Sequence, residues 1–142
     1  MIYIPNYKET RDICHGLKMN DEQAIKIMAE FFLNQNIFND ESFLVPVPNH
    51  NGYAEYTLKI AELMAQQSKA KVLDILKCKP HETLYEQKLK NRKLNLEIFK
   101  IGNIPKGKIF LIDNVIATGK TIYECNKALG INSIPLAMGK VN

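Results

Sequence analysis

The spacing of hydrophobic side chains along the chain predicts three helices. In residues 21–36 and 52–69, apolar positions recur every three or four residues, which is the period of an amphipathic helix. The predicted buried faces carry Ile25, Met28, Ala29 and Phe32 in the first helix, and Ala54, Leu58, Ala61 and Met64 or Ala65 in the second. A third helix is predicted over residues 119–130, because Gly130 is a favourable residue for a helix end.

Short apolar runs between these helices predict strands. The predicted strands are 2–5, 42–48, 70–76, 108–112 and 131–138. Residues 77–95 are polar and basic and fit no element clearly. Strands that alternate with helices predict an α/β fold with a mainly parallel twisted sheet flanked by helices. A chain of 142 residues has room for one such domain, so we expect a single domain over 1–142.

Composition narrows the class of protein without naming a ligand. Hydrophobic residues make up 46% and charged residues 24%, and no apolar run is long enough to cross a bilayer. The net charge of +4 suits an anionic ligand as well as nucleic acid. The first residues lack a basic region followed by a long apolar stretch, so we expect no signal peptide. The three cysteines form no CxxC pair, and we expect free thiols in a cytoplasmic protein.

The stretch after the predicted strand 108–112 carries the clearest chemistry. It reads Asp113-Asn114-Val115-Ile116-Ala117-Thr118-Gly119-Lys120-Thr121. A nucleotide-triphosphate loop needs glycine where Asn114 stands, and the Asp113 carboxylate would repel a triphosphate. The G-x-G-x-x-G pattern of dinucleotide-binding proteins is absent from the sequence.

A ligand that carries one phosphate and a diol fits this stretch better. The helix start that would anchor the phosphate comprises Ala117, Thr118, Gly119, Lys120 and Thr121. Backbone N–H groups and the positive end of the helix dipole suit a compact phosphate there. Asp113 and Asn114 could accept hydrogen bonds from ribose hydroxyls at the entrance of the loop. A turn capped by Thr118 is the purely structural alternative.

The same residues resemble the phosphoribosyl pyrophosphate (PRPP) signature of type I phosphoribosyltransferases, and most closely that of the ComF-like branch. The segments "YKETRDICHGLK" and "FLVPVPNH" resemble further parts of that branch, as do the spaced residues Gln87, Arg92, Asn95 and Phe99. Two features depart from the pattern. The second acid of the signature is Asn114, and the zinc-binding cysteines of the N-terminus are missing.

The resemblance implies a small N-terminal hood, a pyrophosphate-binding loop and a mobile lid. The loop would comprise Asn49, His50, Asn51 and Gly52, and the lid would carry Gln87, Lys88, Lys90 and Arg92. An ordinary turn is the alternative for the loop, and a solvated charged face is the alternative for the lid. Nucleic-acid binding is a weaker interpretation, because no aromatic residues interleave with these cations.

The resemblance further implies a reaction with PRPP and Mg²⁺, in which phosphoribosyl passes to or from a nitrogenous base with pyrophosphate exchange. Asp113 and Asn114 would be the catalytic residues, and no side chain is expected to ligate the metal directly. The alternative is a non-catalytic module that binds PRPP or a nucleoside monophosphate. Such a module could serve as an accessory of competence (DNA uptake). The acceptor base stays open, and a homodimer is compatible with the sequence.

Overall fold

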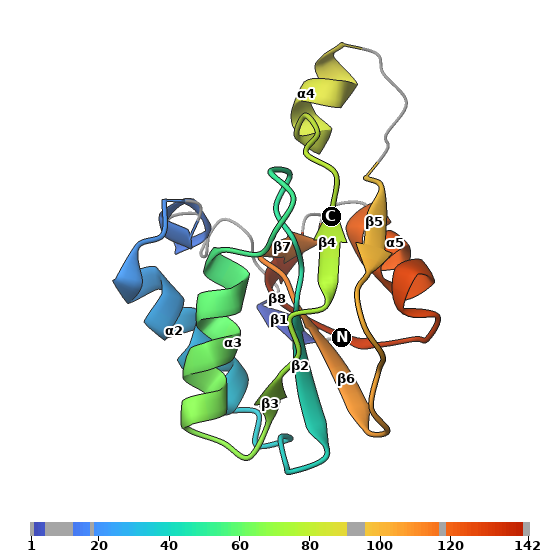
Figure 1. The fold of residues 1–142 in the computed structure, drawn as a ribbon. Coiled ribbons are helices and arrows are strands. Elements are labelled where there is room, and N and C mark those ends of the chain that lie inside the picture. The colour runs from blue at the N-terminus through green and yellow to red at the C-terminus, as the bar shows by residue number, and fades with distance from the viewer. Residues whose placement is uncertain (1, 5–12, 18, 91–95, 117–118, 141–142) are drawn as a thin grey trace.

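The computed structural model describes residues 2–4, 13–17, 19–90, 96–116 and 119–140 (Figure 1). The strands are β1 (Ile2–Ile4), β2 (Ser42–Pro46), β3 (Lys71–Val72), β4 (Leu76–Cys78), β5 (Ile98–Lys100), β6 (Lys108–Ile112), β7 (Val115–Ile116) and β8 (Ile134–Lys140). The helices are α2 (Glu22–Leu33), α3 (Tyr56–Gln66), α4 (Leu84–Leu89) and α5 (Lys120–Leu129). Residues 13–17 add a helical turn before α2.

The main sheet has six strands in the order β1-β8-β6-β2-β3, and β7 pairs with β8. All of these pairs are parallel. β2 and β6 share the longest register, from Ser42 opposite Lys108 to Pro46 opposite Ile112. The prediction of an α/β fold with a mainly parallel sheet is therefore confirmed.

Alternate residues of the central strands face opposite sides of the sheet, as the pleat of a strand requires. Leu44 and Phe110 pack with the buried faces of α2 and α3. Val45 and Leu111, their neighbours in the chain, pack on the other side with α5. The domain thus has helices on both faces of the sheet, with α2 and α3 on one face and α5 on the other (Figure 1).

Helix α2 follows its predicted pattern closely. Asp21 caps its first turn by accepting hydrogen bonds from the backbone N–H groups of Gln23 and Ala24, at 2.8 and 3.3 Å. The predicted face of Ile25, Met28, Ala29 and Phe32 is buried. Among the described residues, no helix is both long enough and apolar enough to cross a membrane.

The helix predicted over residues 52–69 is wrong in its buried positions and in its start. In α3, Leu58 and Ala65 are only half-buried, whereas Thr57 and Ile60 join Ala61 and Met64 in the interior. Ala54 is buried but lies before the helix begins. The error follows from starting the helical period too early in the chain.

The predicted strand 70–76 is in fact two strands in different sheets. β3 leaves the main sheet after Val72, and β4 begins at Leu76 and pairs with β5 in an antiparallel two-stranded sheet. This sheet carries α4, which Figure 1 shows at the far end of the resulting arm. The hydrophobic pattern does not predict β5, β7 or α4. The arm formed by β4, α4 and β5 contains the described part of the predicted lid.

Candidate functional site

The candidate site lies where β2 and β6 end side by side. The N–H of Val47 donates to the carbonyl of Ile112 at 3.0 Å, which holds the two strand ends together. The chain then continues from β2 into the predicted pyrophosphate loop and from β6 into Asp113. In parallel sheets, ligands bind in the crevice beyond the carboxyl ends of the strands. The fold thus brings two of the predicted site segments to the same edge.

Asp113 is a buried carboxyl group at this edge. Its side chain is 8% exposed, and Oδ1 accepts a hydrogen bond from the backbone N–H of Asn114 at 2.7 Å. Burial raises the pKa of Asp113 from 3.8 to about 6, because a buried charge loses its hydration, and the bond from Asn114 lowers it in part. The carboxyl group is therefore mostly ionised at neutral pH, at a cost in free energy of folding.

Asn114 is buried as deeply, with 4% of its surface exposed. Its Nδ2 donates to the backbone carbonyl of Cys14 at 3.4 Å, a contact between residues 100 positions apart. Its Oδ1 is buried and has no hydrogen-bond partner in the part of the chain that the structure describes. Buried polar atoms in native proteins are nearly always paired, so an unpaired acceptor at a strand end needs an explanation.

Tyr56, the first residue of α3, meets the same two residues. Burial raises the pKa of Tyr56, the nearby charge of Asp113 raises it further, and a hydrogen bond with the Asn114 side chain lowers it. The aromatic ring packs against the core on the α2 and α3 side of the sheet. The phenol therefore stays protonated at every ordinary pH and acts as a neutral hydrogen-bonding group.

The start of α5 supplies the predicted phosphate end of the site. Gly119 caps the helix with φ of 82°, and no side chain caps it. Thr121 is half-buried in the first turn. Lys120 forms an ion pair with Glu124 at 2.9 Å, and its Nζ lies 5.7 Å from the centre of the Tyr123 ring. The remaining two predicted phosphate-binding residues, Ala117 and Thr118, lie outside the described residues.

The predicted pyrophosphate loop is a tight turn anchored to β4. The N–H of Gly52 donates to the carbonyl of Asn49 at 3.0 Å, and the N–H of Cys78 donates to the carbonyl of Gly52 at 3.0 Å. Gly52 has φ of 115°, and a Cβ there would lie 2.9 Å from the Cys78 carbonyl oxygen, so only glycine fits. Between these anchors, the N–H groups of His50 and Asn51 have no hydrogen-bond partner among the described residues.

Asn51 links this turn to α3. Its Nδ2 donates to the Glu55 carboxylate, and Glu55 also accepts a hydrogen bond from Asn20 at 3.4 Å. The Asn51 Oδ1 is buried and unpaired within the described chain, as the Oδ1 of Asn114 is. Asp74 Oδ1 is a third such oxygen, but its carboxylate is already paired with Lys77 at 3.1 Å.

The predicted lid residues have different surroundings. Gln87 is buried, and its Nε2 donates to the carbonyl of Glu82 at 2.7 Å, so it holds the base of α4 in place. Lys90 forms an ion pair with Glu82 at 3.1 Å. The side chain of Lys88 and the whole of Arg92 lie outside the described residues. The prediction that these residues close over a ligand stays a prediction.

Sequence reasoning missed the second layer of the site. The hydrophobic pattern places Tyr56 and Glu55 within a predicted core helix, whereas the structure has Tyr56 as the first residue of α3 and Glu55 as the residue before it. The contact of Asn114 with the Cys14 carbonyl involves backbone, and no sequence pattern reports it. Among the described residues, no three His, Cys, Asp or Glu side chains gather as a metal site would require.

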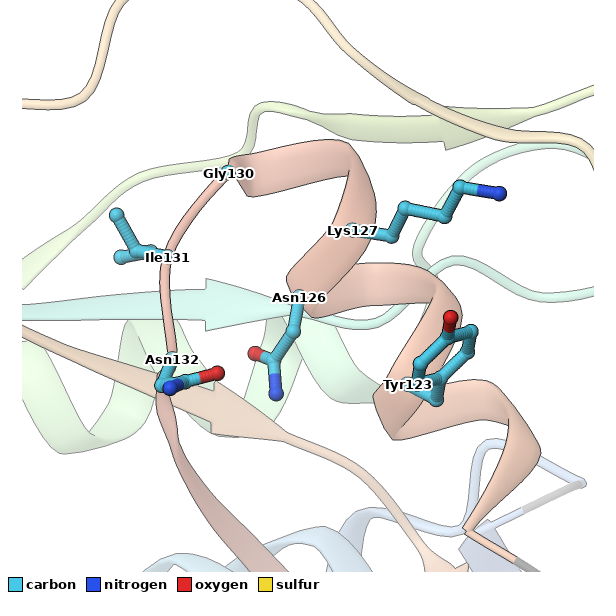
Figure 2. A pocket seen from close by; sticks show the side chains of 6 residues that line it. All are labelled: Tyr123, Asn126, Lys127, Gly130, Ile131 and Asn132. Carbon is cyan, nitrogen blue, oxygen red and sulfur yellow. The ribbon is translucent and has the colours of Figure 1, made fainter.

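A separate hollow of about 420 Å³ lies at the opposite end of α5. Figure 2 shows its lining, which comprises Tyr123, Asn126, Lys127, Gly130, Ile131 and Asn132. None of these residues was predicted to bind a ligand. Asn126, the most central of them, is already engaged, since its Oδ1 accepts from the N and Oγ of Ser133 at 3.1 and 2.5 Å.

Comparisons with known proteins find a distant similarity of fold. No protein-family model matches the chain, and no curated protein does. Among solved structures, the fold is similar to that of a purine phosphoribosyltransferase from Pyrococcus horikoshii Ot3, with a TM-score of 0.45 and 14% identity over 100% of this chain and 90% of that chain. A similarity this distant carries no argument about the ligand or the reaction.

Proposed function

We propose that the chain binds PRPP, or a nucleotide containing ribose 5-phosphate, at the carboxyl ends of β2 and β6. The observation that carries the proposal is the buried pair Asp113 and Asn114, which presents a carboxylate and an unpaired amide oxygen just before the start of α5. Both groups accept hydrogen bonds, which is what a vicinal diol requires. A glycine-capped helix start suits the phosphate of the same ligand.

The reaction that we propose transfers phosphoribosyl to or from a nitrogenous base with exchange of pyrophosphate. The transition state of such a transfer develops positive charge on the ribose ring, and fixed negative charge beside it lowers the barrier. Asp113 is the group that would supply this charge. The free N–H groups of His50 and Asn51 would bind the leaving pyrophosphate. The arm carrying Gln87 and Lys90 would cover it, which excludes water.

We expect magnesium to arrive with PRPP. The described residues do not form a protein-only metal site, but a carboxylate with an amide beside it fits a metal that is held mainly by ligand oxygens and water. Asp113 would hold it through water, and the metal would neutralise charge on the pyrophosphate.

The surroundings of Asn114 favour a second candidate, a non-catalytic module that binds PRPP or a nucleoside monophosphate. An aspartate in its place would put a carboxylate oxygen against the Cys14 carbonyl, where Nδ2 now donates at 3.4 Å. The neutral amide is therefore suited to its position, and it brings no charge to a transition state. A role in competence, which the ComF-like resemblance implies, would belong to this candidate.

Calorimetry with PRPP and Mg²⁺, followed by an assay of pyrophosphate release with a panel of bases, tests both candidates. Asn114→Ala should weaken PRPP binding, and Asn132→Ala, which alters an exposed amide at the far end of α5, should not. Binding with pyrophosphate release supports the enzyme, and binding without release for any base supports the module. Binding that is lost in Asn132→Ala but kept in Asn114→Ala would move the ligand to the hollow of Figure 2.

A further inference from the structure

The strand β5 leaves one of its two edges open. The N–H of Ile101, just after the strand, donates to the carbonyl of Ile75 at 2.8 Å, on the side of β4. In an antiparallel pair, hydrogen-bonded residues alternate with residues whose N–H and C=O groups point away from the partner strand. Ile98 and Lys100 are therefore the residues that point away from β4. Their backbone groups have no backbone partner in the described chain, so the outer edge offers two donors and two acceptors.

A hollow of about 410 Å³ lies beside this edge. It is lined by β5 and by Glu124, Lys127 and Ala128 of α5. The side chain of Ile98 packs against the core that contains the buried face of α5, so α5 lies against a face of β5 and leaves the outer edge uncovered (Figure 1). Neighbouring strands in a sheet are about 4.8 Å apart. A strand added to β5 would therefore lie in this hollow.

The two faces of β5 differ in chemistry. Successive side chains of a strand point to opposite faces. Phe99 and Ile101 lie on the face away from α5, and they are 46% and 45% exposed. Lys100 shares the other face with Ile98 and so lies on the side of α5. A segment that pairs with β5 would meet apolar side chains on one face and lysine on the other.

The unpaired charge beside the hollow is mainly positive. Lys100 and Lys127 are exposed, and neither has an ion-pair partner among the residues that the structure describes. Glu124 is already paired with Lys120 at 2.9 Å. Glu97, the other acid of the lining, precedes β5 and lies at the opposite end of the strand from Lys100. Charge complementarity therefore favours a partner that presents acids on the side of α5.

We propose that the outer edge of β5 binds an extended acidic peptide, which joins β4 and β5 as a third, antiparallel strand. The backbone of the peptide pairs with the N–H and C=O groups of Ile98 and Lys100. Its acidic side chains face Lys100 and Lys127, and the side chains that alternate with them are apolar and cover Phe99. The surface lies apart from the strand ends of β2 and β6, so this inference does not depend on the proposed function.

Binding of synthetic peptides to the full chain tests this proposal. Fluorescence anisotropy would follow a labelled, blocked peptide of alternating glutamate and valine, for which we expect saturable binding. The peptide in which lysine replaces glutamate should bind at least about tenfold more weakly. A third peptide, N-methylated at each glutamate, keeps the side chains but loses the N–H groups that would pair with the edge. It should also lose about tenfold in affinity, because two hydrogen bonds are removed.

Substitutions at Lys100 separate the backbone from the charge. Lys100→Gln and Lys100→Pro both remove the lysine, but only proline removes an outward N–H, and neither removes a hydrogen bond to β4. Lys100→Gln and Lys127→Gln should each weaken binding about two- to threefold at low salt. Lys100→Pro should bind about fivefold more weakly than Lys100→Gln. Lys26→Gln, an exposed change on α2, is the control, and thermal melting reports folding.

Four results would overturn the proposal or a part of it. If the glutamate peptide shows no saturable binding, the edge is not a peptide site. Equal binding of the lysine peptide would contradict the choice of an acidic partner. If the N-methylated peptide binds as tightly as the unmodified one, or Lys100→Pro binds as tightly as Lys100→Gln, the peptide is not held as a strand. If sedimentation shows a dimer that Lys100→Pro does not form, a second copy of the chain occupies the edge.

Discussion

The two ends of α5 differ in whether the buried polar groups beside them have hydrogen-bond partners in the described chain. The carboxyl end borders the hollow of about 420 Å³, where the Asn126 oxygen already accepts hydrogen bonds from the backbone N–H and the hydroxyl of Ser133. The amino end lies six residues after Asn114 in the chain, and at Asp113 and Asn114 a carboxyl group is buried and an amide oxygen has no partner in the described chain.

This difference has an energetic meaning. A buried polar group without a partner lowers stability, and a protein keeps such a group where a ligand completes it. The Asn126 oxygen, which already accepts two hydrogen bonds, has no such requirement. The unpaired Asn114 oxygen and the buried Asp113 carboxylate therefore lower the free energy of unfolding of the ligand-free protein.

The largest expected effect comes from removing the buried charge. In the wild type, the raised pKa of Asp113 means that the folded state holds its proton up to about pH 6, whereas the unfolded state releases it near pH 3.8. The free energy of unfolding therefore falls as the pH rises from 3.8 to about 6, and the penalty is complete above that window. Asp113→Asn should be more stable than the wild type by roughly 3 kcal/mol at high pH, and equally stable at low pH.

Urea unfolding on both sides of this window measures the effect, with Asp40→Asn, an exposed carboxylate, as the control. The same Asp113→Asn variant should lose affinity for PRPP, because its amide can present N–H where an acceptor is needed. Replacement of a functional group is expected to raise stability and to lower binding affinity. If Asp113→Asn were no more stable than the wild type above this pH window, the buried Asp113 charge would not lower the free energy of unfolding.

At the carboxyl end of α5, the opposite behaviour is expected. Asn126→Ala removes the acceptor of two hydrogen bonds from Ser133 and should lower the free energy of unfolding by about 1–2 kcal/mol. PRPP affinity should not change. Chemical denaturation and calorimetry on the same preparation test this, and a loss of affinity without a loss of stability would contradict the comparison.

The same glycine-to-alanine substitution can be made at both ends of α5 and its effects compared. Gly119 and Gly130 cap α5 with φ of 82° and 75°, and a Cβ would meet nothing within 4 Å at either position. Alanine at each should cost about 1 kcal/mol from the left-handed backbone alone. Only Gly119→Ala should also weaken ribose 5-phosphate binding, by about tenfold, because the methyl group occupies the place where a phosphate would approach. Equal effects on binding would remove the distinction between the ends.

The central sheet and the strand-end pair could be predicted from sequence because local patterns determine them. The run 108–112 is apolar throughout, and β6 is buried at four of its five positions, as a central parallel strand should be. Asp113 and Asn114 follow it directly, so their place at the sheet edge was a consequence of the strand. The left-handed cap at Gly119 fits the same prediction.

The rest depended on contacts between distant segments. Residues 70–76 divide between two sheets because β4 pairs with β5 and not with the main sheet. β5 begins 20 residues after β4 ends, and its Phe99 is 46% exposed. The contact of Tyr56 with Asn114 joins residues that no periodicity relates. Hydrogen bonds to backbone, such as that to Cys14, leave no trace in the identity of the acceptor residue.

The smallest expected effect concerns Lys120, which stands at the amino end of α5 but pairs with Glu124 one turn further on, at 2.9 Å. The pair is partly solvated, so Glu124→Gln should cost less than about 0.5 kcal/mol of stability. If Lys120 binds the ligand phosphate, it must first leave Glu124, and removing that competing charge should raise ribose 5-phosphate affinity about two- to threefold at low salt. Glu62→Gln, an exposed change on α3, is the control, and calorimetry at two salt concentrations is the measurement. If neither Glu124→Gln nor Lys120→Gln alters the affinity, Lys120 belongs to the surface of the helix, and the phosphate is held by the backbone at Gly119 and by Thr121.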